Sequence, residues 1–163
     1  MLPQDLPYRP NVSALIVRAD GKLLAARRTD MPGAGGPLSE GIWQCPQGGI
    51  DTGEDTRHAV LRELHEELGT DKFVIKYEYP EWIPYDLPEH LIGKALGGRY
   101  RGQTQKWFVV EFLGKDSDIN LAFQNPPEFD VFQWVSPAEF LALDLGFKKA
   151  LYEHVLAHYT SRP

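Results

Sequence analysis

The sequence predicts an α/β fold of the α+β type, an α/β/α sandwich in which a mixed β-sheet lies between helices. Segments rich in β-branched and aromatic residues come before, between and after segments with helical periodicity. This order is typical of a mixed sheet covered by helices. The 163 residues contain no internal repeat and no low-complexity linker, so we expect a single domain spanning residues 1–163.

The first elements of the chain are predicted to form an antiparallel hairpin. Its strands cover residues 12–18 and 22–27, and Asp20-Gly21 supplies the turn signal between them. Residues 32–40 are rich in Gly and Pro and are expected to form a surface loop. A short strand is expected at 42–45.

A helix is predicted at residues 55–68, because an acidic residue opens it and Gly69 follows its last turn. The remaining predicted elements are strands at 73–79, 105–112 and 132–135 and helices at 140–143 and 147–159. Prolines and glycines interrupt the long stretch between the strands at 73–79 and 105–112, which is therefore expected to be a connection.

The composition limits the classes of function. Seventeen Lys and Arg residues oppose 23 Asp and Glu residues, so the net charge is −6, and there is no basic run for broad capture of a nucleic-acid backbone. The single Cys45 excludes an internal disulfide framework and a zinc site built from cysteines. Neither a signal peptide nor an apolar run of roughly 20 residues is apparent. We expect a cytoplasmic monomer with no membrane partner.

Three glutamates of the helix at 55–68, Glu63, Glu66 and Glu67, lie three and four residues apart. Each such pair of like charges costs an isolated helix about 0.2–0.5 kcal/mol. At about 100° per residue, the three lie beside the expected core face, which comprises Val60, Leu61, Leu64 and Leu68. The remaining side is expected to face water and carries His58, Arg62 and His65.

A divalent cation would turn this repulsion into attraction. Carboxylate oxygens on one helical face suit Mg²⁺, with Mn²⁺ as a substitute. The alternative is an exposed acidic helix whose glutamates pair with Lys or Arg. Gly48-Gly49 lets the backbone approach a ligand closely, so the Gly48 carbonyl is a further candidate metal ligand. Glu54 can reach Arg62 only if the loop folds back over the helix, where the pair would fix loop to helix.

The spacing from Gly48 to Glu54 and on to Arg62-Glu63-Leu64-His65-Glu66-Glu67-Leu68-Gly69 resembles the Nudix box. This box is the signature of hydrolases that act on nucleoside diphosphates linked to another group. The sequence departs from the pattern at Thr70, where an aliphatic residue is usual. The resemblance implies a Nudix sandwich and water attack on phosphorus, with Mg²⁺ held by Glu63, Glu66 and Glu67.

Stretches from Tyr8-Arg9-Pro10 to Phe147-Lys148-Lys149 resemble one Nudix branch, the asymmetrical dinucleoside tetraphosphate hydrolases and RNA 5′-pyrophosphohydrolases. By this resemblance, polyphosphate would be bound by Arg9, Arg28 and Lys106, a nucleobase by Tyr85 and Phe147, and phosphate or water by Gln47 and Gln103. Glu128 would be a fourth carboxylate ligand or the general base, a role for which Glu67 is the other candidate, and Glu63 would be a further catalytic carboxylate. The plainer alternatives are surface cations for the basic residues, core packing for Phe147, turn packing for the glutamines and a solvated loop residue for Glu128.

The segment from Tyr85 to Gln103 looks more like the plant-type dinucleotide hydrolases, and the chain lacks the basic tail common in the RNA enzymes. Together with the net charge of −6, this favours a dinucleoside polyphosphate partner, diadenosine tetraphosphate, cleaved to ATP and AMP. The alternative is removal of pyrophosphate from a triphosphorylated RNA 5′ end. A non-catalytic nucleotide-binding Nudix module would differ by loss of the metal glutamates, and all three are intact.

Overall fold

The computed structural model describes residues 2–28 and 41–161, so the loop predicted at 32–40 lies outside the described residues. The strands are β1 (Tyr8–Val17), β2 (Leu23–Arg28), β3 (Trp43–Gln44), β4 (Gln47–Gly49), β5 (Phe73–Glu78), β6 (Ile83–Asp86), β7 (Gly102–Phe112) and β8 (Phe129–Val135). The α-helices are α1 (Thr56–Leu68), α2 (Pro137–Leu141) and α3 (Lys149–Ser161). The 3-10 turns are η1 (Pro3–Asp5), η2 (Glu89–Leu91), η3 (Ala95–Gly98), η4 (Asp116–Asp118) and η5 (Gly146–Lys148).

The strands form one mixed sheet, as predicted. Its order is β3-β2-β1-β7-β5, with β4 paired to β1, β6 to β7 and β8 to β2. β1 and β7 run parallel along the centre, from Tyr8 opposite Gly102 to Val17 opposite Glu111, and the other pairs are antiparallel. This parallel register places Arg9 beside Gln103.

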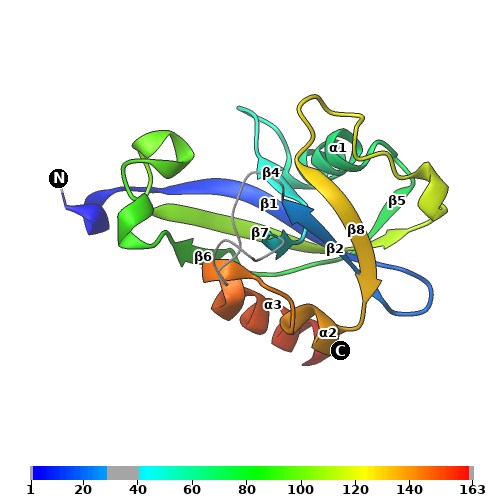
Figure 1. Cartoon of the computed structure of the whole chain (residues 1–163). Coiled ribbons are helices and arrows are strands. Elements are labelled where there is room, and N and C mark those ends of the chain that lie inside the picture. The colour runs from blue at the N-terminus through cyan, green and yellow to red at the C-terminus, as the bar shows by residue number, and fades with distance from the viewer. Residues whose placement is uncertain (1, 29–40, 162–163) are drawn as a thin grey trace.

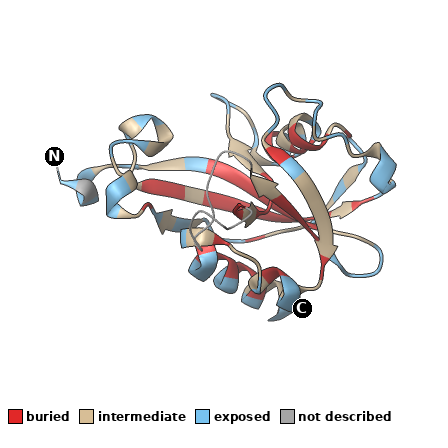
Figure 2. Ribbon diagram, in the orientation of Figure 1, coloured by how far each residue is buried: buried red, intermediate tan, exposed pale blue. Residues whose placement is uncertain are grey.

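Helices cover both faces of the sheet, which confirms the predicted sandwich (Figure 1). Successive side chains of a strand point to opposite faces, so Trp107 of β7 packs on the side of α3 while Phe108 packs on the side of α1. The two buried clusters lie on opposite faces of the sheet, and the buried residues lie mainly in β1, β2 and β7 and on the inward sides of α1 and α3 (Figure 2). None of the described helices is long and apolar enough to cross a membrane.

The predicted hairpin forms, but its two strands separate at once. β1 and β2 pair only at Val17 and Leu23, because β1 continues along β7 and β2 along β8. β4 and β6 were not expected. Gly48-Gly49 was expected only to let the backbone approach a ligand, and Pro84 to interrupt a connection, yet β4 borders β1, and β6 is an edge strand, where proline is tolerated.

The helices begin and end close to their predicted positions. Gly69 has φ 72° after the last residue of α1, the left-handed conformation that glycine adopts without strain. Leu61 was expected in the core but is 37% exposed. Ala59 is buried instead. The buried face of α1 is therefore rotated around the helix axis, away from Leu61 and toward Ala59.

Candidate active site

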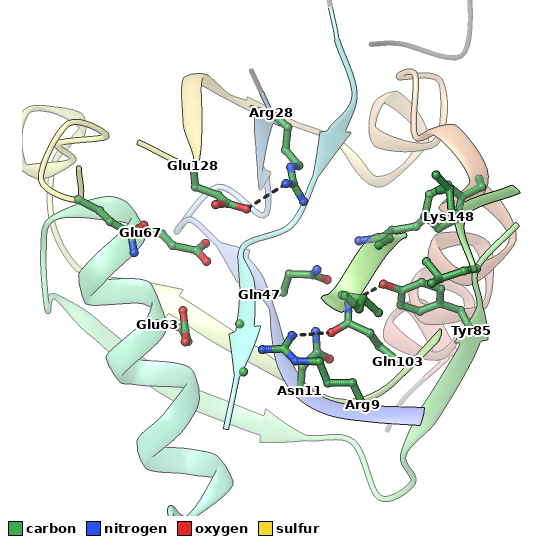
Figure 3. A pocket seen from close by; sticks show the side chains of 18 residues that line it. Arg9, Asn11, Arg28, Gln47, Glu63, Glu67, Tyr85, Gln103, Glu128 and Lys148 are labelled. Atoms are coloured by element: carbon green, nitrogen blue, oxygen red, sulfur yellow. Dashed lines mark hydrogen bonds and ion pairs between the residues drawn. The ribbon is translucent and has the colours of Figure 1, made fainter. Parts of the chain in front are cut away.

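A cleft of about 370 Å³ opens at one end of the sheet, between α1 and the residues that precede α3. The structure brings together here most of the candidate residues, namely Arg9, Arg28, Gln47, Gly48, Glu63, Glu67, Tyr85, Gln103, Glu128 and Phe147. The carboxylates lie on one side, with Arg28 paired to Glu128 at 3.6 Å, and the other basic, amide and phenol side chains lie on the opposite side (Figure 3). The cleft therefore offers donors to both a cation and an anion.

The acidic side consists of Glu63 and Glu67 from α1 and of Glu128, which directly precedes β8. Glu67 is only 5% exposed, and its Oε2 has no hydrogen-bond partner among the described residues. Burial, followed by the charges of Glu63 and Glu128, raises the pKa of Glu67 well above its ordinary value. Burial also raises the pKa of Glu63. Glu63 pairs with Arg62 at 3.0 Å and Glu128 with Arg28 at 3.6 Å, so the buried Glu67 Oε2 is the carboxylate atom of this corner that lacks a partner among the described residues.

These residues fit a divalent metal by their chemistry. The donors are hard oxygens, and the unpartnered Glu67 Oε2 needs a ligand. The backbone at Gly48 approaches the Glu63 carboxylate so closely that a side chain at Gly48 would overlap it. Among the described residues, however, no three acidic, histidine or cysteine side chains are gathered tightly enough to hold a metal as they stand. The ligand set of Gly48, Glu63, Glu66, Glu67 and Glu128 stays a prediction.

Arg62 connects the loop before α1 to the carboxylates. Its Nε and Nη2 donate to the two Glu54 oxygens at 2.7 and 2.8 Å, and Nη2 also donates to the Gly49 carbonyl at 2.9 Å. Nη1 donates to Glu63 at 3.0 Å and to Glu66 at 3.2 Å. The bonds from Arg62 to Glu54, followed by one from the Asp51 N–H, lower the pKa of Glu54 to about 2.

The predicted contact between Glu54 and Arg62 is thus present. The expectation that Arg62 faces water was wrong, because the loop folds back over it and leaves its side chain 23% exposed. Glu66 contacts Arg62 and is not part of the cleft lining. These hydrogen bonds hold β4 against α1 and so fix the Gly48-Gly49 backbone that lines the cleft.

The opposite side is a chain of hydrogen-bonded polar groups. Arg9 Nη1 donates to Gln103 Oε1 at 3.0 Å, and Gln103 Nε2 donates to the Tyr85 hydroxyl at 2.6 Å. Gln105 Nε2 donates to Gln47 Oε1 at 2.7 Å. These bonds fix the side chains before a ligand arrives, which lowers the entropy cost of binding.

A model of the NUDIX domain family matches residues 7–156. The chain belongs to the Nudix family. An RNA pyrophosphohydrolase of Gluconacetobacter diazotrophicus is 57% identical over 155 residues, which cover 95% of this chain and 93% of that protein. An RNA pyrophosphohydrolase of Gluconobacter oxydans is 56% identical over 154 residues, 94% of this chain and 86% of that protein. The C. elegans Ap4A hydrolase binary complex has a TM-score of 0.63 at 18% identity, covering 93% of this chain and 98% of that one, which shows the shared fold alone.

Lys106 is the predicted phosphate-binding residue of this Nudix domain that the structure does not place in the cleft. It follows Gln103 by three residues along β7, and this odd spacing directs the two side chains to opposite faces of the sheet. Lys106 Nζ lies 3.4 Å from Glu78 Oε2, and its side chain is 9% exposed. It therefore has a structural partner away from the cleft.

Lys148 and Asn11 line the cleft of the Nudix domain but were not among the predicted site residues. Asn11 is fully buried, and neither atom of its amide has a hydrogen-bond partner among the described residues. Lys148 is 7% exposed, and its Nζ lies 5.2 Å from the centre of the Tyr85 ring. Both lie in stretches that carry the Nudix-branch resemblance. The position of a single Lys or Asn in the sequence, however, does not show whether its side chain points into a cleft.

Lys148 predicts a pH dependence of substrate binding. Burial, followed by the charge of Arg28, lowers the pKa of Lys148 from 10.5 to about 8, so its positive charge is present at pH 7 and lost as pH rises past 8. We expect KM for a polyphosphate substrate to rise between pH 7 and 9. Lys148→Met should raise KM about tenfold at pH 7 and flatten this dependence.

KM and kcat measured across this pH range check the prediction. Lys149→Met is the matched control, because Lys149 is exposed and is not part of the cleft lining. A KM that keeps its full pH dependence in Lys148→Met would contradict the assignment.

Proposed function

We propose that this Nudix hydrolase removes pyrophosphate from the 5′ end of triphosphorylated RNA. The observation that carries the proposal is the 57% identity to an RNA pyrophosphohydrolase over 95% of the chain. The cleft supports it, because a polar, partly basic side faces a carboxylate corner across one cavity (Figure 3). Such a site suits a polyphosphate bound between cations.

In this reaction water attacks phosphorus, the bond between the α and β phosphates breaks, and RNA 5′-monophosphate and pyrophosphate result. Arg9, Arg28 and Lys148 would bind the phosphate oxygens and position the chain. Glu67 or Glu128 would take the proton from the attacking water. A divalent cation at the carboxylates, Mg²⁺ or Mn²⁺, would supply neutralisation of phosphate charge and activation of water.

Cleavage of diadenosine tetraphosphate to ATP and AMP is the second candidate. The net charge of −6 favours it, because long-range attraction to an RNA backbone depends on basic charge. Tyr85 and Phe147, with ring centres 6.1 Å apart, would serve either substrate by stacking on a base. The relatives named RNA pyrophosphohydrolase are far more similar to this chain than the Ap4A hydrolase is, and for this reason we rank RNA first.

A competition assay tests this order. The protein is supplied with Mg²⁺, diadenosine tetraphosphate and a short 5′-triphosphorylated RNA together, and pyrophosphate, ATP and AMP are followed over time. Pyrophosphate as the dominant product is the expected result. A dominant yield of ATP and AMP would reverse the order of the two candidates, and the absence of all three products would support a binding module.

A further inference from the structure

One part of the cleft lining is apolar and has no part in the proposed phosphate chemistry. It consists of Leu87, Leu91, Ala95 and Leu96, which we call the apolar wall. All four belong to the segment between β6 and β7, at the end of the sheet near the N-terminus (Figure 1). Phosphate groups gain nothing from hydrocarbon contact, because burying a charge without a partner is costly. We therefore expect the apolar wall to contact a part of the substrate other than its phosphates.

Leu96 occupies an unfavourable backbone conformation at this wall. Its φ of 55° and ψ of 37° lie in the left-handed region, and no other non-glycine residue in the described part of the chain has a positive φ. Glycine is the usual residue in such a conformation, and Asn or Asp can offset its cost by local hydrogen bonds, whereas leucine cannot. Outliers of this kind persist where the surroundings impose them, and they cluster at ligand-binding sites.

The segment that carries Leu96 is held by hydrogen bonds and close packing on both sides of this residue. The segment is closed at its base by a hydrogen bond from the Leu87 N–H to the Arg101 carbonyl at 2.8 Å. Within it, the Lys94 N–H donates to the Leu91 carbonyl at 3.1 Å. Gly98 packs so closely that an added Cβ would lie 2.8 Å from the Gly93 carbonyl oxygen. The apolar wall is thus a preformed surface.

We propose that the apolar wall binds the face of a nucleobase of the substrate, with Leu96 as a specificity-determining residue. The inference rests on the proposed nucleotide chemistry of the same cleft. Of the phosphates, the ribose and the base, only the base offers a flat apolar face. Tyr85 and Phe147 provide a separate aromatic surface in the cleft, so the two surfaces together can hold two bases of one substrate.

Two substitutions of Leu96 remove the proposed contact of its side chain with the base and are compatible with the left-handed backbone conformation. Leu96→Gly relieves the left-handed strain, and Leu96→Asn introduces a residue that tolerates it. For both we expect a Tm close to that of the parent and a KM for triphosphorylated RNA raised about fivefold or more, with kcat little changed. Leu113→Asn is the matched control, because Leu113 is 60% exposed and is not part of the cleft lining.

Abasic RNAs decide whether a base is what Leu96 contacts. Triphosphorylated RNAs that lack the base of nucleotide 1 or of nucleotide 2 are compared with the intact RNA. If the apolar wall holds a base, the KM penalty of Leu96→Asn disappears with one of the two abasic RNAs, which identifies that base. A KM equal to the parent's on intact RNA, or an equal penalty on all three RNAs, overturns the proposal.

Failure of the proposed function has a separate readout, which is a parent protein that releases no pyrophosphate from RNA. In that event the same variants are compared on diadenosine tetraphosphate and on its analogue lacking one adenine. The same disappearance of the KM penalty supports the apolar wall as a base site, and its persistence refutes it.

Discussion

Glu67→Gln is expected to reduce kcat by about a hundred- to ten-thousandfold, the range typical of losing a general base, while the protein stays folded. Glu67 is 5% exposed, and one of its oxygens has no hydrogen-bond partner among the described residues. Burial, followed by the nearby charges of Glu63 and Glu128, opposes the ionisation of its carboxyl group. Gln keeps the shape and removes the charge, so the repulsion falls and the Tm should equal or exceed that of the parent. Residues retained at a cost in stability are typical of active sites.

The measurement compares kcat and Tm of the parent, of Glu67→Gln and of a matched control, Glu153→Gln. Glu153 is an exposed residue of α3 and is not part of the cleft lining. The control should match the parent in both quantities. Undiminished turnover by Glu67→Gln would refute the assignment of this carboxylate to the reaction. Glu128→Gln in the same series distinguishes the two candidate general bases, because the base should show the larger fall in kcat.

The carboxylate helix could be predicted from the sequence because its information is local. The spacing of Glu63 and Glu67 along one helix determines that both lie beside the buried stripe, and the distance from Glu54 to Arg62 requires the loop to fold back. The structure contains the resulting ion pair at 2.7 Å. Local spacing also placed Gly69 after the last turn of α1.

Residues on strands and loops were harder to place, because their directions depend on distant pairing. Lys106 faces away from the cleft on account of the register of β7, which is set by β1 nearly a hundred residues earlier. Gly48 and Gly49 form a strand only because β1 offers them a partner. The apolar wall lies in a segment without periodicity, so nothing in the sequence separates Leu96 from an ordinary loop leucine.

Gly48→Ala is expected to lower kcat/KM by about a hundredfold, the scale on which small displacements of reacting groups act, with a modest change in Tm. The added methyl group would occupy the position of the Glu63 carboxylate. That carboxylate is the end of a flexible side chain and can move away without disturbing β4, whose pairing with β1 at Val12 stays intact. We therefore expect little loss of stability from Gly48→Ala, but a displacement of the Glu63 carboxylate from its place in the cleft.

A double variant shows whether the effect of Gly48→Ala passes through Glu63. If it does, adding Gly48→Ala to Glu63→Ala leaves kcat/KM unchanged, because the displaced group is already absent, and the two effects are strongly non-additive. Additive losses would mean that Gly48 contributes by another route, for which its own carbonyl is the candidate. The comparison thus shows whether the Glu63 side chain of α1 or the Gly48 carbonyl of β4 is the group through which Gly48→Ala acts.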